Sequence, residues 1–419
     1  MQANIQTLTV PRFSLAERER RWKLVRQLMD RDGLDAIVAP SLGGLQAAVR
    51  YLTGIGGNNA PVAVFFPRVG EVTALTGPVP HREHWLAFQD WVTDIRANFF
   101  SEGDALVERL RELSLERGRI GIVGLADLPR LPDGIVPHGI YIKLRHAFPN
   151  AELVNATFLM DEARFVKSNE EIAFLQHSIE LVEGAIETLV REARTGVPES
   201  VVYAHMIASM LEQGGELPAM VLWAAGSPQP LSNAFLPTQR KLQQGDIITS
   251  EIEARWGGYV GQVTLTGVIG KVPSDYAEMF RIQQEIIDQA YEHFRPGVTI
   301  AELLSIGEEL TQGTSYQSRM IMHSRGLGND APIAVFGAQD ERIKSWRIEE
   351  NCVFVIKPVV MTNEWIRSAS WSTSFIGDEY RSATRHDART VCWGDTVVAT
   401  SSGAQRLGKR PREFIEIGR

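Results

Sequence analysis

Two glutamates lie two residues apart in a stretch whose pattern predicts a β-hairpin. Residues 245–253 are rich in β-branched side chains, Gly257 and Gly258 predict a turn, and a second β-branched run follows. Since alternate residues on a strand share a face, Glu251 and Glu253 are expected to point the same way. Two acids on one face of an apolar strand are costly to bury unless they are paired or functional. A pair of solvated acids on an edge strand is the alternative explanation.

Size and composition limit the class of protein. At 419 residues the chain is long enough for two domains, and its 44% hydrophobic and 22% charged residues are ordinary for a globular protein. The net charge of −8 argues against nucleic acid or an anionic membrane as partner. Cys352 and Cys392 do not make a disulfide framework and fit a reducing compartment. With neither a signal-peptide pattern nor an apolar run of about 18 residues, we expect a cytoplasmic protein with no membrane partner.

The first part of the chain alternates helical and strand patterns. Ser14 and Glu17 form a capping-box pattern for a helix to Asp32, which Gly33 ends. Further helices are expected at 45–52, 104–117 and 141–146, and strands at 35–39, 61–66, 72–75, 120–123 and 151–154. This alternation predicts an α/β domain with a mixed sheet over residues 1–160.

The remaining residues, 161–419, carry longer helical patterns. Helices are expected at 170–194, 201–213, 276–294 and 300–310. Beside the hairpin, strands are expected at 220–223, 320–322, 352–356 and 396–400. These patterns predict an α+β domain of antiparallel strands with long helices.

Several segments, in this order along the chain, resemble motifs of the creatinase/aminopeptidase P family. They are an N-terminal marker (50–54), a linker (160–172), a metal-ligand hairpin (245–266), a histidine motif (323–328) and two final motifs (354–358 and 394–398). The resemblance runs from about residue 14 to about residue 410. It implies an α/β creatinase-like N-terminal domain, an α+β pita-bread C-terminal domain and a homodimer.

The resemblance does not extend to the family's metal ligands. Metal-dependent members hold two divalent ions with two aspartates, a histidine and two glutamates. The corresponding residues here are, in order, Glu251, Gln262, His323, Lys357 and Gly394. An ammonium group and a glycine cannot replace carboxylate ligands, and hard divalent ions need several oxygen or imidazole ligands. We therefore expect no metal and no cofactor, with Lys357 taking over part of the metal's electrostatic role.

Four of these five residues can still act as catalytic groups. His323 can shuttle a proton, with Glu251 or Glu253 orienting it or acting as a base. Lys357 can polarise a carbonyl group or stabilise an oxyanion, and Gln262 can donate a hydrogen bond to the same oxygen. A structural histidine and a buried Lys357–Glu251 pair without catalytic function are the alternatives.

Five further residues are expected to contact a substrate. Trp223 can form an apolar or cation-binding wall, although core packing explains it equally well. Ser232 lies in the loop where the resemblance to creatinase implies a catalytic histidine. The remaining three are Glu253, Asp330 (the position of a second family histidine) and Asp395, beside Gly394.

Together these residues predict a metal-independent hydrolase of a C–N bond, amide or amidine-like, in a small molecule. A lyase or cyclase on the same scaffold is the first alternative. A non-catalytic binding module is the second. The third is an Xaa-Pro aminopeptidase-like metallopeptidase, which the substituted ligands oppose, and fold alone does not settle function.

Overall fold

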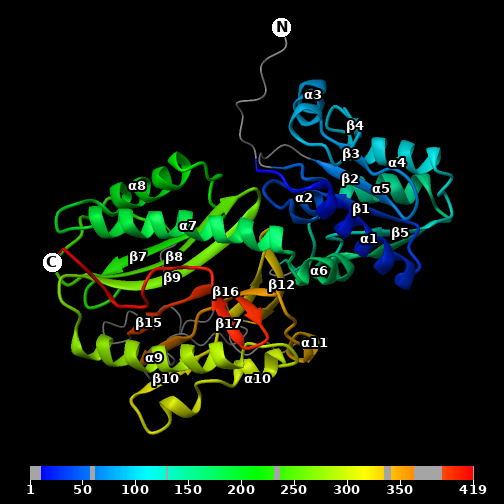
Figure 1. Cartoon of the computed structure of the whole chain (residues 1–419). Coiled ribbons are helices and arrows are strands. Elements are labelled where there is room, and N and C mark those ends of the chain that lie inside the picture. Colours follow the sequence, from blue (N-terminus) through cyan, green and yellow to red (C-terminus); the bar gives the residue numbers. More distant parts are fainter. Residues whose placement is uncertain are drawn as a thin grey trace, which may run out of the picture. The chain divides into compact units, whose positions relative to one another are not determined.

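The structure, a computed structural model, describes residues 11–56, 62–128, 131–230, 236–334, 341–362 and 389–418 (Figure 1). These residues form two compact units. The first contains the chain up to Glu170 together with Leu327–Ala331, and the second contains Glu171–Gly326 and the chain from Pro332 onward. The expected boundary at residue 160 falls inside helix α6 (Thr157–Phe165).

The first unit is a mixed sheet with helices, as the alternating pattern predicts. Its helices are α1 (Leu15–Asp32), α2 (Ala47–Thr53), α3 (Val79–Phe88), α4 (Glu102–Glu112), α5 (His138–Ala147) and α6. Its strands are β1 (Ala36–Pro40), β2 (Ala63–Pro67), β3 (Thr73–Leu75), β4 (Asp94–Arg96), β5 (Arg119–Ile122) and β6 (Glu152–Asn155). The strand order is β4-β3-β2-β1-β5-β6, with parallel and antiparallel pairs.

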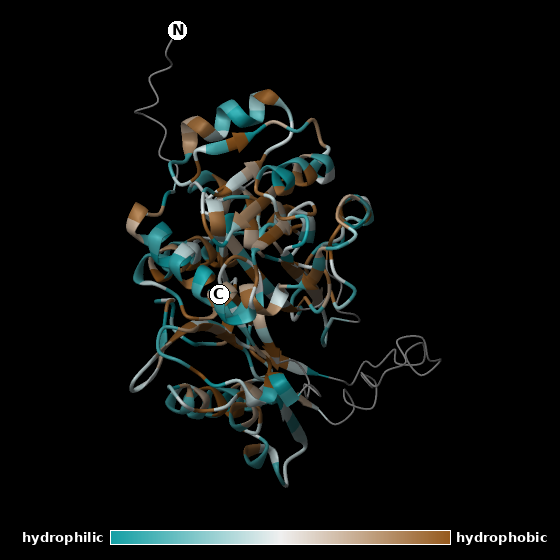
Figure 2. Cartoon of the chain, turned by 90° about the vertical axis from the view of Figure 1, so that its right-hand side faces the viewer, coloured by the Kyte–Doolittle hydropathy of each residue, from teal (hydrophilic) through white to brown (hydrophobic). Residues whose placement is uncertain are grey.

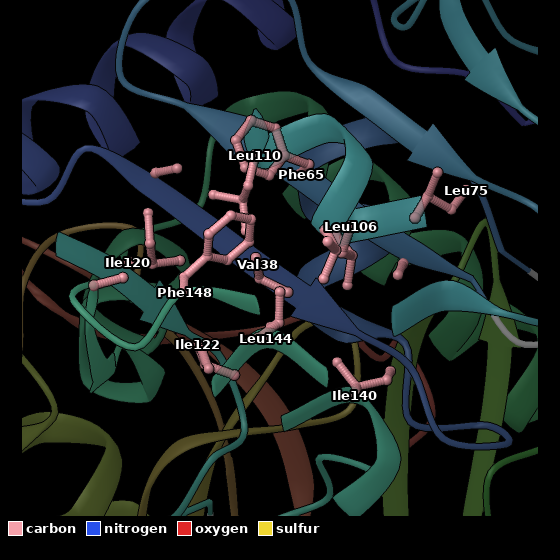
Figure 3. Close-up of a cluster of buried hydrophobic side chains, with 14 residues drawn as sticks. Val38, Phe65, Leu75, Leu106, Leu110, Ile120, Ile122, Ile140, Leu144 and Phe148 are labelled. Atoms are coloured by element: carbon pink, nitrogen blue, oxygen red, sulfur yellow. The ribbon is translucent and has the colours of Figure 1, made fainter. Parts of the chain in front are cut away.

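Local signals in the sequence account for α1 and for the core of this unit. The Ser14 hydroxyl accepts a hydrogen bond from the Glu17 amide, and Gly33 ends the helix at a φ of 66°, which suits glycine. Figure 3 shows the core, where side chains of α4 and α5 pack on the sheet. Among its members are Val38, Phe65, Leu106, Leu110, Ile120, Leu144 and Phe148.

The second unit combines three sheets with long helices. Its helices are α7 (Asn169–Glu192), α8 (Glu199–Glu212), α9 (Ser274–His293), α10 (Ile300–Leu304), a 3₁₀ helix (Glu309–Thr311) and α11 (Glu341–Ser345). Its first strands are β7 (Val221–Gly226), β8 (Ile247–Trp256), β9 (Tyr259–Ile269), β10 (Tyr316–Arg319), β11 (Met322–Arg325) and the second half of β12 (Asn329–Ala334), whose residues up to Ala331 belong to the first unit. The others are β13 (Val353–Ile356), β14 (Val359–Thr362), β15 (Thr390–Cys392), β16 (Asp395–Thr400), β17 (Gly403–Arg406) and β18 (Ile415–Ile417).

Strand β9 joins two of these sheets. The sheet orders are β18-β9-β8-β7, β12-β11-β13-β16-β17 and β10-β14-β15. Thr264 of β9 exchanges two backbone hydrogen bonds of 2.9 Å with Gly394, just before β16. In Figure 1, α7 and α8 cover one side of β7, β8 and β9, and α7 approaches so closely that a Cβ on Gly261 would lie 2.9 Å from the Ile179 backbone nitrogen. Figure 2 shows apolar colour along many interior strands and hydrophilic colour on outward helical turns.

Two of the elements expected in this unit differ clearly from the structure, and the strands β10, β12, β14, β15, β17 and β18 were not expected from the sequence. The helix expected over 300–310 is interrupted, because Gly307 has a φ of 94° between α10 and the 3₁₀ helix. The strand expected at 320–322 begins only at Met322, and residues 320 and 321 connect β10 to β11. Within the described ranges, none of the helices combines the length and the apolar character that a bilayer span requires.

Candidate active site

The β8–β9 hairpin presents four polar side chains on one face. Both turn glycines have left-handed φ angles, 56° for Gly257 and 85° for Gly258, as a tight two-residue hairpin turn requires. In the register that this turn sets, Glu251 lies opposite Thr264 and Glu253 lies opposite Gln262. Since directly opposed residues and alternate residues share a face, all four side chains project to the same side. The expectation for the two glutamates is confirmed.

Three of the predicted catalytic residues meet on this face. Lys357 Nζ lies 2.7 Å from Glu251 Oε1, and Gln262 Nε2 donates a hydrogen bond to the same oxygen. The Lys357 side chain is 5% exposed, that of Glu251 is 16% exposed, and Gln262 is fully buried. We call this group the Glu251–Gln262–Lys357 cluster. An ion pair with so little water around it is stronger than a surface pair but must compensate the desolvation of both charges.

Gly394 provides the space that Lys357 occupies. A Cβ atom on Gly394 would lie 2.3 Å from Lys357 Cβ and 3.0 Å from Lys357 Cα. Rotation of the Lys357 side chain cannot relieve these contacts, because they involve its Cα and Cβ atoms. The glycine at the family's last ligand position and the lysine at the preceding one are therefore sterically linked.

The thiol of Cys392 lies within electrostatic reach of the cluster. Burial raises the pKa of this thiol to about 12; the Lys357 ammonium lowers that pKa and the Glu251 carboxylate raises it. Cys392 is fixed by its backbone, which exchanges hydrogen bonds of 3.0 and 3.1 Å with the Thr266 hydroxyl. A protonated thiol at this place is a poor nucleophile, because the thiolate is the reactive form.

His323 is buried on β11, in register with Val355 of β13. Its Nδ1 lies 3.4 Å from the Ser324 carbonyl oxygen. The backbone amide of Lys357, two residues after Val355, donates to the Ile321 carbonyl at 2.9 Å, which continues the same ladder. Strand alternation therefore puts His323 and Lys357 on one face of this sheet.

Glu253 forms a second buried ion pair, with Arg325. Arg325 Nη2 donates to Glu253 Oε1 at 2.8 Å, and both side chains are almost fully buried. Arg325 Nε also donates to the Val260 carbonyl oxygen at 3.3 Å. Through these two contacts Arg325 connects β8 and β9 to β11, the strand that carries His323. Glu253 was expected to contact substrate, and in the structure its carboxylate is paired with Arg325.

Trp223 and Asp395, two expected substrate contacts, point away from the cluster. Trp223 opposes Ser250, whose side chain is on the other face from Glu251, and its indole N–H donates to Glu199 at 3.1 Å. Asp395 opposes Ile356, one residue out of phase with Lys357, and pairs with Arg406 at 2.8 Å. Strand alternation places both side chains on faces opposite the cluster, and the complete burial of Trp223 agrees with core packing, the explanation that the sequence left equally open.

Asp395 is further enclosed by a hydrogen bond of 3.0 Å from the Tyr291 hydroxyl. Burial raises the pKa of Tyr291 well above its ordinary value, and the nearby Asp395 carboxylate adds to this rise. Asp330 belongs to the first unit, where its carboxylate lies 3.4 Å from Lys167 Nζ and 3.5 Å from Arg164 Nε. The remaining expected contact, Ser232, lies outside the described residues.

Sequence reasoning missed the parts played by Gly394, Cys392 and Arg325. Arg325 follows His323 by two residues, and a charged residue inside an apolar segment was the one available signal for its buried pair. The packing of Gly394 and the position of Cys392 depend on contacts between distant segments, which no local pattern reveals.

Comparison with known proteins identifies the family. The profile of metallopeptidase family M24 matches residues 173–401, and that of the creatinase/prolidase N-terminal domain matches residues 21–166. The chain belongs to metallopeptidase family M24. The resemblance to the creatinase/aminopeptidase P family is thereby confirmed for this M24 protein, as is its architecture of a creatinase-like domain followed by a pita-bread domain.

Relatives cover nearly the whole M24 chain at low identity. An Xaa-Pro dipeptidase from Pyrococcus horikoshii is 22% identical over 402 residues, 94% of this chain and 98% of the relative. A creatinase from a Bacillus species is 24% identical over 361 residues, 83% of this chain and 82% of the relative. The crystal structure of an X-Pro aminopeptidase from Thermotoga maritima has a TM-score of 0.74 at 19% identity, over 94% of this chain and 99% of that chain. Such likeness shows the fold, and the site residues must decide the chemistry.

The side chains of the cluster do not fit the metal ions that the family name implies. Glu251, a carboxylate that could ligate a cation, already has the Lys357 ammonium 2.7 Å away. Of the other family ligand positions, His323 keeps an imidazole, but Gln262, Lys357 and Gly394 offer no carboxylate, and a hard divalent ion needs several oxygen or imidazole ligands. Over the part of the chain that the structure describes, no three histidine, cysteine, aspartate or glutamate side chains gather as a metal site would need.

The substitution Gly394→Ala should displace Lys357 and destabilise the protein by about 1–3 kcal/mol, the usual cost of overpacking a closely packed site. Gly139→Ala is the matched control, because a Cβ there meets no atom within 4 Å. Urea unfolding measures both variants. Equal effects of the two substitutions would show that Gly394 does not make room for Lys357.

The substitution Arg325→Met should lower the free energy of unfolding by about 3–5 kcal/mol, because it leaves the Glu253 carboxylate buried without a cation. Arg281→Met is the control, since Arg281 is 63% exposed in its pair with Glu285 and should cost at most about 1 kcal/mol. Urea titrations at neutral pH compare them. A loss for Arg325→Met no larger than for the control would contradict the buried pair.

The raised pKa of Cys392 predicts an alkaline loss of stability. The thiol ionises near its ordinary value of 9.0 in the unfolded chain and at about 12 in the folded one. Its contribution is therefore complete below about pH 9 and is lost as the pH rises toward about 12. Between about pH 8 and pH 10.5, wild type should lose about 2 kcal/mol more than Cys392→Ala in urea unfolding. A pH-independent difference between the two proteins would refute this placement of the thiol.

Proposed function

We propose that this M24 protein is a metal-independent hydrolase of a C–N bond in a small molecule, with the Glu251–Gln262–Lys357 cluster as its reaction centre. The observation that carries the proposal is the distance of 2.7 Å between Lys357 Nζ and Glu251 Oε1. Metal-dependent members of the creatinase/aminopeptidase P family carry metal-ligating carboxylates at these two positions. A positive charge thus remains at the site although the metal ligands are substituted.

Lys357 is the electrophilic group in this proposal. Its ammonium donates a hydrogen bond to the carbonyl oxygen of the substrate, on which negative charge develops as water adds to the carbonyl carbon. The charge of Lys357 acts strongly because its side chain is 5% exposed, so that little water screens it.

Glu251 is the base. Lys357 and Gln262 both bind its Oε1 atom, which leaves Oε2 to accept a proton from the attacking water. The tetrahedral adduct then breaks its C–N bond, and the proton passes to the departing nitrogen, so that acid and amine are the products. His323, on the same sheet face as Lys357, is the second group that can carry this proton.

Gln262 holds the base in place. Its amide N–H donates to Glu251 Oε1, and its backbone exchanges hydrogen bonds of 3.0 and 2.8 Å with the Thr396 hydroxyl of β16. The glutamine is thereby fixed to both sheets. A base that is oriented by fixed neighbours needs little reorganisation during the reaction.

A second candidate is a metal-dependent Xaa-Pro dipeptidase, and the name of the Pyrococcus horikoshii relative favours it. The donor set of the cluster opposes it. The two candidates predict opposite responses to chelation, so one assay separates them.

The substitution Lys357→Met should lower kcat by about 10²–10³-fold, as removal of an oxyanion-stabilising donor usually does. The assay follows amine release from a panel of small amides, and from an Xaa-Pro dipeptide, by enzyme treated with a chelator. Lys344→Met is the control, since Lys344 pairs with the exposed Glu341 on α11. We expect the wild-type and control activities to survive chelation.

Two results would contradict this proposal. One is an activity that appears only after a divalent metal is restored. The other is an activity of Lys357→Met equal to that of the control variant, since the ammonium would then have no part in the reaction.

A further inference from the structure

Two buried polar atoms beside the cluster lack hydrogen-bond partners among the described residues. They are Gln262 Oε1 and Thr264 Oγ1, and both residues are at least nine-tenths buried. The orientation of the Gln262 amide is fixed by chemistry, because a carboxylate oxygen only accepts and the group facing Glu251 must be the N–H. The other end of the amide is therefore an acceptor without a donor.

Both atoms are on the face that carries the cluster. Thr264 opposes Glu251 in the hairpin register, and Gln262 touches Glu251 directly. Buried acceptors are seldom left without a donor in native proteins, because the lost hydration is not regained. The missing partner must be a donor, N–H or O–H, that reaches Gln262 Oε1.

The charges on this face nearly cancel. Lys357 neutralises Glu251, Arg325 neutralises Glu253, and Gln262 and Thr264 are neutral. A cationic ligand would therefore enter without an uncompensated anion to pair with, and burying an unpaired charge is costly. A neutral ligand fits this balance.

We propose that the site recognises a neutral amide by its N–H: the ligand donates this hydrogen to Gln262 Oε1 and accepts a hydrogen bond from Lys357 Nζ on its carbonyl oxygen. Lys357 Nζ and Gln262 Nε2 both contact Glu251 Oε1, so the ammonium group and the side-chain amide that carries the acceptor are neighbours. Thr264 Oγ1 supplies a further partner for a primary amide. The inference rests on the proposed function and narrows its substrate class.

Two other classes of C–N compound are excluded by this recognition. Amidinium and guanidinium cations carry a charge that the face does not balance. An amide bond to proline nitrogen has no N–H, so it would leave Gln262 Oε1 without a donor. Primary amides, ureas and lactams remain, because each can direct an N–H and its carbonyl oxygen to the same side, whereas a secondary amide in the trans form cannot.

Three small probes of similar shape test the proposal. Their equilibrium binding to the protein is measured by ligand-observed NMR. They are acetamide, N,N-dimethylacetamide, which lacks the N–H, and acetamidinium, which is cationic. For wild type, acetamide should bind about tenfold or more tightly than either of the others, the usual effect of leaving a buried polar group unpaired.

Substitutions at Gln262 decide whether this residue sets the preference. Gln262→Met, which has neither donor nor acceptor, should remove the preference for acetamide over N,N-dimethylacetamide. Gln262→Glu adds a carboxylate and should reverse the preference toward acetamidinium, a gain that misfolding cannot produce. Gln283→Met is the matched control, because Gln283 is also fully buried and its Nε2 donates to the Val391 carbonyl oxygen.

The proposal is overturned if wild type prefers acetamidinium, if acetamide and N,N-dimethylacetamide bind equally, or if no probe binds saturably. It is also overturned if Gln262→Glu keeps the wild-type preference. Selective acetamide binding without turnover of any amide would support this recognition while contradicting the hydrolase. Metal-dependent turnover would likewise contradict the metal-independent hydrolase but not the recognition of an amide. Failure of the proposed function can therefore be distinguished from failure of the proposed recognition.

Discussion

The ion pair between Lys357 and Glu251 is the interaction on which the account of this site depends. Its two partners come from β8 and from the residue that follows β13, so it also connects two sheets of the second unit. Replacing such a pair by apolar side chains is often neutral or stabilising, so stability alone does not explain why it is present. Retention of a charge where the family carries metal ligands is the functional explanation that we favour.

The surroundings of this pair form a consistent set. Gly394 leaves the space into which Lys357 packs, Gln262 binds the shared oxygen of Glu251, and Arg325 removes the charge of Glu253. Two of these features depend on a partner residue. Lysine beside a glutamate at position 394 could not pack as it does here, and a second free carboxylate at position 253 would leave the buried face negative.

Much of this could be predicted from the sequence, because it depends on local rules. Strand alternation and the glycine turn predicted that Glu251 and Glu253 share a face. The order of the family motifs predicted that Lys357 lies opposite Glu251. The orientation of Trp223 and Asp395 could not be predicted, because it depends on the strand register across the sheet, and a shift of one residue reverses the face. The ion pair of Glu253 could not be predicted, because its partner is 72 residues away in the chain. Helix α3 was not expected either, because it buries no residue and so has no apolar stripe in the sequence.

Metal content of the purified protein tests the central claim most directly. Elemental analysis would be made after exposure to manganese, cobalt and zinc and removal of the excess. If Lys357 has taken over the metal's electrostatic role, bound metal should be far below one ion per chain, and Lys357→Met should not change that. Stoichiometric binding of one or two ions per chain by the wild-type protein would contradict the account.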